Sequence, residues 1–181
     1  ANTVRDITQI KEAVELPVIG IIKKEYEGTP MYITVTMKEV DELVGCGVDI
    51  LAVQGTSALR PDGSTAAQFI KEIRKKYPKQ LIMADCATVE EGISCAQAGA
   101  DFVGTTMRGY TPETQGCDDI DYDFIHELCE RCPARIIAEG HIHDPQQAKK
   151  ALEAGAFALV VGGAITRPAE ITARFVAAIQ K

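Results

Sequence analysis

The sequence predicts an α/β fold, a barrel of parallel strands that are each followed by a helix. Short apolar runs rich in β-branched residues alternate with amphipathic segments along the chain, which is typical of strand–helix repeats. The runs are apolar at nearly every position, so both faces of each strand are expected to be buried, as in a parallel sheet. Three joints, VGCGVDI, AQAGADF and LEAGAFA, place a glycine just before a strand, where a left-handed residue ends the preceding helix.

The elements can be placed in order along the chain. The apolar runs predict strands at 18–22, 49–53, 81–84, 101–105, 135–139 and 158–162. The amphipathic segments predict helices at 4–14, 37–46, 65–76, 88–98, 121–131, 144–154 and 167–179. Four helix starts carry a capping residue and, three positions later, a Glu or Gln: Thr36 with Glu39, Thr65 with Gln68, Thr88 with Glu91, and Asp144 with Gln147. Each pair is expected to satisfy free backbone amides reciprocally.

The alternative to a barrel is an open, doubly wound sheet. That fold usually has a glycine-rich first turn, whereas here polar residues follow every strand, which favours a closed barrel. A complete (β/α)8 TIM barrel has eight strands and about 250 residues, but this chain has 181 residues and opens directly in a helix. We therefore expect a single domain, residues 1–181, that is a TIM barrel lacking its first strand–helix unit and most of its second strand.

Composition and charge limit the function. Hydrophobic residues make up 46% and charged residues 25% of the chain, as in soluble globular proteins. The net charge of −7 argues against nucleic acid or an anionic membrane as a partner. The opening residues lack the basic and apolar regions of a secretory signal, and the six cysteines are expected to be reduced thiols. These features indicate a cytoplasmic protein.

In a barrel of this kind the active site lies at the carboxyl ends of the strands. Lys23 follows the first apolar run directly. A lysine inside the barrel mouth is partly desolvated, which lowers its pKa and lets it act as a base. Lys24 adjoins it, and alternation along a strand does not say which of the two faces inward. A surface lysine is therefore the alternative interpretation.

Carboxyl groups end two other strands. Glu139 ends RIIAE and precedes Gly140, and Asp85 ends LIMAD. Burial of a carboxylate is costly unless the group is paired or used, which favours a role in the site. The alternative is a glutamate that caps a helix or forms a salt bridge. A lysine and carboxylates at one mouth suit proton abstraction next to a carbonyl, followed by reprotonation.

The stretch VVGGAITRP at 160–168 predicts a phosphate site. Gly162 and Gly163 let backbone amides approach an anion, and the helix that follows offers its positive end. Arg167 could add a forked contact. Phosphate sites recur at this place, after the last strand of a barrel. Thr105, in GTTMRGYT at 104–111, is expected to add a hydroxyl and an amide.

Two patterns that look like metal sites are discounted. Cys129, Cys132 and His126 lie on one side of a helix, but a structural zinc site needs a fourth ligand. His141 and His143 form an H-x-H pair, yet a barrel metallohydrolase would need further histidines and the chain has three in total. We therefore expect no catalytic metal.

Motifs along the whole chain resemble the N-acylmannosamine-6-phosphate 2-epimerase family of sialic acid breakdown. They are LPVIGIIKKEY (16–26), MYITVTMKEVDELV (31–44), RPDG (60–63), LIMADCATVEEG (81–92), DFVGTTMRGYT (101–111), IIAEG (136–140) and VVGGAITRP (160–168). Other phosphate-binding barrels share the glycine-rich last turn but not this set, so the resemblance is specific.

The resemblance implies an isomerase of amino sugar catabolism, without metal or cofactor, on a (β/α)8 barrel of the phosphate-binding type. It would interconvert N-acetylmannosamine 6-phosphate and N-acetylglucosamine 6-phosphate by deprotonation and reprotonation at carbon 2. Lys23 matches the proton-transferring lysine, and Glu139 the glutamate that assists ring opening and stabilises or delivers the proton. Asp85 matches a sugar contact and Arg167 a phosphate contact. The expected substrate-binding residues are completed by Thr105, Gly140, Gly162 and Gly163.

The chain departs from the family pattern at the site. The family carries a glutamine on its first unit and an arginine just before the ANT seen here, and neither falls within this sequence. Gln54 stands where the family usually has an acid, which is expected to weaken sugar binding or shift the local charge. Open strand edges invite pairing, so a homodimer is expected. The alternative functions are another phosphosugar barrel enzyme (a pentose-phosphate epimerase or a lyase), or phosphosugar binding without turnover.

Overall fold

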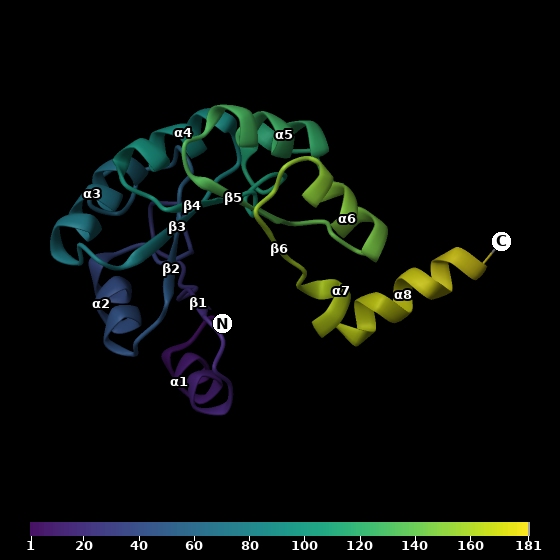
Figure 1. Cartoon of the computed structure of the whole chain (residues 1–181), viewed down its shortest axis with the longest axis horizontal. Helices are drawn as coiled ribbons and strands as arrows, with labels where there is room; N and C mark the ends of the chain where they lie inside the picture. The colour runs from purple at the N-terminus through teal and green to yellow at the C-terminus, as the bar shows by residue number, and fades with distance from the viewer. Residues whose placement is uncertain (181) are drawn as a thin grey trace.

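The computed structural model describes residues 1–180, which form a curled parallel sheet with helices on its outer side (Figure 1). The strands are β1 (Ile19–Gly20), β2 (Ile50–Gln54), β3 (Leu81–Asp85), β4 (Phe102–Gly104), β5 (Arg135–Glu139) and β6 (Ala158–Val160). Each strand pairs in parallel with the next one in the chain. The strands therefore lie in chain order without a switch point. This order confirms the predicted α/β fold with a barrel-like parallel sheet.

The seven predicted helices are present, with ends within one or two residues of the predicted ones. They are α1 (Val4–Ala13), α2 (Met37–Gly45), α3 (Ala66–Lys76), α4 (Val89–Ala98), α5 (Tyr122–Arg131), α6 (Pro145–Glu153) and α8 (Pro168–Ile179). Two short elements were not predicted: the 3₁₀ turn η1 (Pro112–Thr114) and α7 (Gly163–Thr166). Helix α7 begins in a Gly-Gly pair, which sequence propensity disfavours.

The helix ends follow the local chemistry of the sequence. The three predicted threonine caps form capping boxes. At α6 only half of the predicted cap forms: Asp144 accepts from the Gln147 amide at 2.8 Å, while the Gln147 side chain accepts from the amide of His143. The predicted glycine stops have left-handed φ values of 76°, 115° and 111° at Gly47, Gly99 and Gly155 respectively.

Both faces of the central strands β2 to β5 are largely buried, as predicted from the continuous apolar runs, whereas β6 at one end of the sheet is only half-buried. Leu51 and Val53 pack outward against the helices in the main core, together with Ile70 of α3. The residue between them, Ala52, faces inward and belongs to a second cluster with Met83, Phe102 and Ile137. This inward-facing cluster lies on the concave side of the curled sheet.

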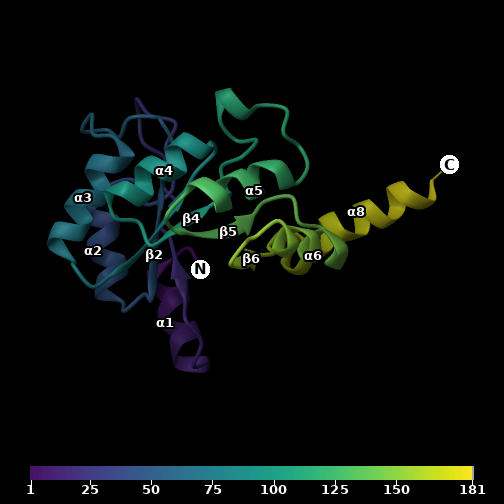
Figure 2. The ribbon, with the colours of Figure 1, turned by 45° about the horizontal axis from the view of Figure 1, so that its top comes forward.

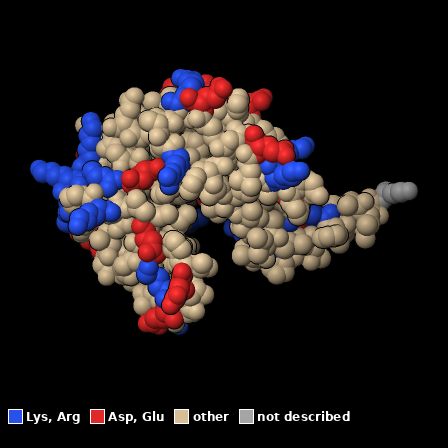
Figure 3. Space-filling view, in the orientation of Figure 1, with Lys and Arg blue, Asp and Glu red and all other residues tan. Residues whose placement is uncertain are grey.

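The sheet is an open arc rather than a closed circle within residues 1–180 (Figures 1 and 2). At one end, the Ala1 amino group donates to the Ile19 carbonyl and the Ala1 carbonyl accepts from the Ile21 amide, both at 2.9 Å. This is the bonding pattern of a parallel strand beside β1. At the other end α7 and α8 project away from the body, and a hollow separates them from α1 (Figure 3).

The helices of residues 1–180 were also compared with the dimensions of a lipid bilayer. Crossing it takes about 20 predominantly apolar residues, and no helix in this part of the chain is long and apolar enough.

Candidate active site

A cavity of about 390 Å³ opens at the carboxyl ends of the strands, on the concave side of the arc. It brings together side chains from distant parts of the sequence. Of the predicted site residues, the cavity is lined by Lys23, Glu139, Gly140, Gly162, Gly163 and Arg167. Asp85 and Thr105 lie behind this wall rather than on it. The structure therefore brings six of the eight predicted residues together on one cavity.

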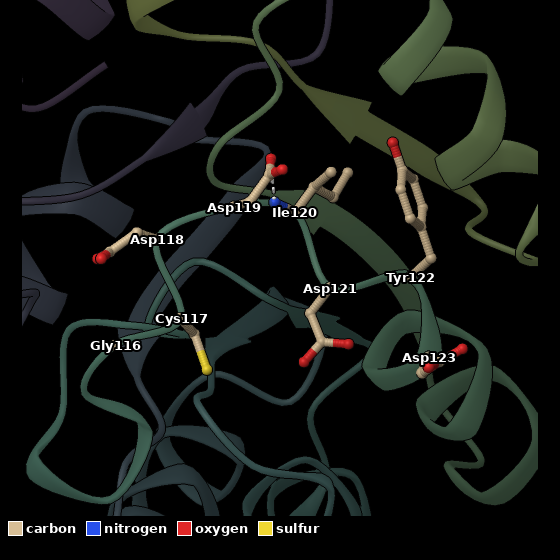
Figure 4. Close-up of a pocket in the computed structure, with 8 residues that line it drawn as sticks. All are labelled: Gly116, Cys117, Asp118, Asp119, Ile120, Asp121, Tyr122 and Asp123. Atoms are coloured by element: carbon tan, nitrogen blue, oxygen red, sulfur yellow. Dashed lines mark hydrogen bonds between the residues drawn. The ribbon is translucent and has the colours of Figure 1, made fainter.

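A larger hollow, of about 560 Å³, lies along the loop of residues 116–123 before α5 (Figure 4). Its wall carries carboxylates and no basic side chain. Asp118, Asp119 and Asp123 point in different directions (Figure 4), and Asp121 is paired with Arg108 at 2.8 Å. Such a surface repels anions and brings no side chains together for catalysis, so we place the candidate site in the smaller cavity.

The local pairing of the chain decides which lysine faces the cavity. Lys23 forms an antiparallel bridge with Ile33, and its ammonium lies 5.8 Å from the centre of the Tyr32 ring on the cavity wall. Lys24 lies over the Tyr26 ring instead, at 4.8 Å. Lys23 is exposed within the described residues.

Asp85 and Glu139 share a hydroxyl group. The Thr106 Oγ1 lies 2.8 Å from Asp85 Oδ1 and 3.1 Å from Glu139 Oε2. Burial, and to a lesser extent the nearby charge of Glu139, raise the pKa of Asp85 to about 7 against the opposing effects of Thr106 and Lys23. Burial also raises the pKa of Glu139. Asp85 can therefore hold a proton near neutral pH, and the raised pKa of Glu139 also favours its protonated form, which suits general acid–base chemistry.

Thr105 acts on the main chain of Glu139. Its hydroxyl donates to the Glu139 carbonyl at 2.7 Å and accepts from the Glu139 amide at 2.9 Å. These two bonds fix the end of β5, from which the Glu139 side chain reaches the cavity. The structure thus places Thr105, predicted as a substrate contact, in a position that orients Glu139.

Two glycines allow the close approach of these groups. A Cβ atom on Gly104 would lie 2.8 Å from Asp85 Oδ1 and 2.4 Å from the methyl carbon of Met83, so a side chain there would displace the carboxyl. Gly140 turns the chain after β5 with a φ of 100°, and His141 follows at 56°. A positive φ is costly for a residue other than glycine, so the surrounding packing must hold His141 in place.

The predicted anion site consists of the turn between β6 and α8. Gly162 caps α7 and Gly163 begins it, and both glycines line the cavity. Arg167 reaches the same wall but is paired with Glu170 at 2.8 Å. Sequence analysis missed Glu170, although its position three residues beyond Arg167 is the spacing of a helical ion pair.

Three aromatic residues on the cavity wall were also missed. Tyr32 and Tyr110 line the cavity, and Tyr110 stacks on His141 with ring centres 5.9 Å apart. The Nε2 of His141 is buried without a hydrogen-bond partner. The H-x-H motif had been considered only for metal binding, and no group of three or more potential metal ligands occurs within residues 1–180. Its place after a strand end was the signal for a cavity residue.

Gln54 lies in the interior of the protein, although the family resemblance placed it near the sugar. It is 2% exposed and does not line the cavity. Its side chain accepts from the amides of Tyr32 at 3.0 Å and Ile33 at 3.4 Å, and donates to Thr56. Because Ile33 bridges Lys23, Gln54 supports the segment that holds Lys23.

The curled parallel sheet defines an α/β-barrel-type protein, and its cavity is lined by Lys23 and Glu139 together with the turn that carries Gly162, Gly163 and Arg167. A family model described as "Putative N-acetylmannosamine-6-phosphate epimerase" matches residues 1–181. The chain belongs to this family.

Individual relatives agree with the family model. A protein of Caldanaerobacter subterraneus named "Putative N-acetylmannosamine-6-phosphate 2-epimerase" is 50% identical over 181 residues, which are 100% of this chain and 76% of that protein. A protein of the same name from Enterobacter sp. is 47% identical over 182 residues, covering 99% of this chain and 77% of that protein.

Solved structures give the same fold. The N-acetylmannosamine-6-phosphate 2-epimerase of Clostridium perfringens has a TM-score of 0.92 and 43% identity over 99% of this chain and 77% of its own. A thiamine phosphate pyrophosphorylase from Pyrococcus furiosus has a TM-score of 0.59 and 16% identity over 91% of this chain and 70% of its own, a likeness of fold alone.

Proposed function

We propose that this chain is a 2-epimerase that interconverts N-acetylmannosamine 6-phosphate and N-acetylglucosamine 6-phosphate. The observation that carries the proposal is the convergence of Lys23 and Glu139 on one cavity, which Arg167 and the glycine turn also line. The cavity volume of about 390 Å³ lies within the range of small-molecule sites, roughly 300–1,000 Å³. The family of the chain and the names of its relatives support the same substrate.

The chemistry needs a base and an acid at one carbon. In the open-chain sugar the C1 carbonyl acidifies the proton on carbon 2. Lys23 removes this proton, the electron pair moves into the C1–C2 bond, and the carbonyl oxygen gains charge that an acid must neutralise. Glu139, with its raised pKa, assists ring opening and holds the proton for this oxygen. Glu139 then takes the proton back from the C1 oxygen as the carbonyl re-forms, and transfer of the Lys23 proton to the opposite face of carbon 2 gives the epimer.

Binding of the phosphate falls to the last turn. The amides of Gly162 and Gly163 and the guanidinium of Arg167 would hold the dianion. Gly140 would let the sugar approach the end of β5. Asp85 and Thr105, which lie behind the wall, would act on the substrate through Glu139.

The function is tested by proton NMR of N-acetylmannosamine 6-phosphate with the chain in deuterated water and excess chelator. Loss of the carbon-2 proton signal, with growth of the N-acetylglucosamine 6-phosphate spectrum, is the expected result. Exchange only after addition of a divalent metal would contradict the proposed metal-free chemistry. Folded protein that binds the phosphosugar but exchanges no proton would make the chain a binding protein instead.

The Arg167–Glu170 pair gives a prediction about phosphate binding. Glu170 neutralises Arg167 within the cavity wall, so Glu170→Gln is expected to lower KM for the phosphorylated sugar about 3- to 10-fold, while Arg167→Ala raises it by at least as much. Both effects should vanish for the sugar without phosphate. Steady-state kinetics with the two sugars measure this, and an unchanged KM in both variants would place the phosphate elsewhere.

The fold can be stated more finely as a proposal. The six strands would be consecutive strands of an eight-stranded (β/α)8 barrel, in which a strand would pair with β1 where Ala1 now lies. The 77% coverage of the Clostridium structure supports this. Fusion of a family-type strand–helix–strand segment ahead of residue 1 should raise the unfolding temperature; no increase would contradict the proposal.

We also propose that the chain forms a homodimer in the cytoplasm. Helix α8 exposes Phe175 at 70% and Ile179 at 77%, an apolar face that either a second chain or the further barrel elements proposed above would cover. The cysteines within residues 1–180 are all free thiols, as expected in a reducing compartment. Sedimentation of the protein as a monomer at all concentrations, or its recovery outside the cytoplasm, would contradict these two statements.

A further inference from the structure

We propose that Thr106 is a positioning residue that passes a single proton between Asp85 and Glu139, so that the two carboxyls work as one acid–base unit. The inference rests on the proposed function and extends it to a residue that does not match any of the catalytic or binding positions carried over above. It assigns a role to Asp85, which is buried and does not line the cavity within the described residues.

The Thr106 hydroxyl has too few hydrogen atoms to satisfy two ionised carboxyls at once. The Thr106 hydroxyl lies within hydrogen-bond distance of both carboxyls, at 2.8 Å and 3.1 Å, but it has one proton to donate. With both carboxyls ionised, one of the two short oxygen–oxygen contacts would hold no hydrogen and would be repulsive. Both contacts are satisfied when one carboxyl is protonated and donates to Thr106, which donates to the other.

This arrangement permits a balanced transfer. The Asp85 O–H bond breaks as its proton forms a new bond to Thr106 Oγ1. At the same time the original Thr106 O–H bond breaks, and that proton bonds to Glu139 Oε2. Two O–H bonds break and two form, so the net change is one proton moved from Asp85 to Glu139. The reverse transfer restores the starting state.

The groups around Asp85 and Glu139 favour a state in which the two carboxyls share one proton. Asp85 on β3 is 3% exposed, and the charge of Glu139 on β5 opposes its ionisation. Lys23, after β1, faces both carboxyls and favours their ionised forms, as does the Ala1 amino group toward Glu139. Asp85 in turn faces the phenol of Tyr32, whose pKa is raised mainly by burial. Like charges in a buried pair are the standard reason for one shared proton.

The geometry also places each group where the relay needs it. Glu139 lines the cavity and Asp85 does not, while Thr106 reaches both the cavity wall and Asp85. Gly104 keeps the space between them open, because a Cβ atom there would lie 3.1 Å from Thr106 Oγ1 and 2.8 Å from Asp85 Oδ1. Asp85 thus holds a proton away from solvent and delivers it through Thr106.

The test compares variants that remove or keep the hydroxyl. Thr106→Val removes it at nearly constant volume, and Thr106→Ser keeps it. The matched control is Thr56→Val, which removes another buried hydroxyl that accepts a hydrogen bond from Gln54 at 3.1 Å. The measurements are kcat and KM between pH 5 and pH 9, and the ¹³C carboxyl titrations of the same proteins without substrate.

The expected result is a kcat about 10- to 100-fold lower in Thr106→Val, with little change in KM and with a displaced pH profile. Thr106→Ser should stay within about threefold of the parent, and Thr56→Val should keep the parent pH profile. In the titrations, Asp85 and Glu139 should titrate as a coupled pair in the parent and separately in Thr106→Val.

Identical pH profiles and titrations in the parent and Thr106→Val would overturn the inference, as would independent titration of the two carboxyls in the parent. Should Thr106→Val not fold, Thr106→Ala removes the same hydroxyl from a smaller side chain. The titrations need no turnover. If the two carboxyls titrate as a coupled pair but the protein exchanges no carbon-2 proton, the proposed function is wrong and this inference stands. If the protein exchanges the proton and Thr106→Val has the pH profile of the parent, this inference is wrong and the proposed function stands.

Discussion

Replacement of Lys23 by alanine is expected to lower the rate of carbon-2 exchange by about 10²- to 10⁴-fold, the usual contribution of a positioned general acid or base. Lys23 is the only lysine on the cavity wall formed by the described residues, so no second amine can replace it. The fall should appear in kcat more than in KM, because the proton is transferred after the sugar has bound. Exchange of the carbon-2 proton in deuterated water measures this step directly.

Lys24→Ala is the matched control for this prediction. It removes the same charge from the adjacent residue, whose ammonium lies over Tyr26 instead of facing the cavity. The overall field of the protein changes equally in both variants, so only a local role distinguishes them. Equal losses in Lys23→Ala and Lys24→Ala would mean that the net charge matters and that Lys23 does not transfer the proton.

The comparison of these two lysines shows where sequence reasoning stopped. The alternation of a strand places Lys23 and Lys24 on opposite faces but does not say which face is inside. The answer comes from the bridge between Lys23 and Ile33, which depends on a segment folded back by Gln54. The contact between Gln54 and Ile33, 21 residues apart, leaves no local pattern in the sequence.

The convergence of the strand ends, in contrast, was predictable. Parallel strands that follow each other in order must place their carboxyl ends on one side, so Asp85, Glu139 and the 160–168 turn had to meet. The sequence could not show which neighbour of each strand end reaches the cavity. Thr106 reaches it and Thr105 does not, because the chain leaves β4 at Gly104 and turns at the next residues.

The second large effect concerns stability and pH. The carboxyl of Asp85 has a pKa of about 7 in the folded protein, against 3.8 for the ordinary group. Between these values the folded state binds a proton that the unfolded state has lost, so the free energy of unfolding falls as the pH rises from about 4 to above 7. At 1.36 kcal/mol per pH unit, the full difference corresponds to about 4 kcal/mol as an upper value.

Asp85→Asn removes this dependence because an amide does not ionise. Its free energy of unfolding, relative to the parent, should therefore rise by about 2–4 kcal/mol between pH 4 and pH 8, while its epimerase activity falls. Denaturant unfolding at several pH values measures the difference.

Asp62→Asn provides a control of opposite sign. Hydrogen bonds from Ser64 lower the pKa of Asp62, so its contribution to stability is present above the unfolded pKa and is lost as the pH falls. Asp62→Asn should therefore be less stable than the parent at pH 8 and approach it in acid.

A constant difference between Asp85→Asn and the parent at every pH would mean that Asp85 ionises alike in the folded and unfolded chain. The carboxyl pair would then hold no proton at neutral pH, and Glu139 would have to act without Asp85.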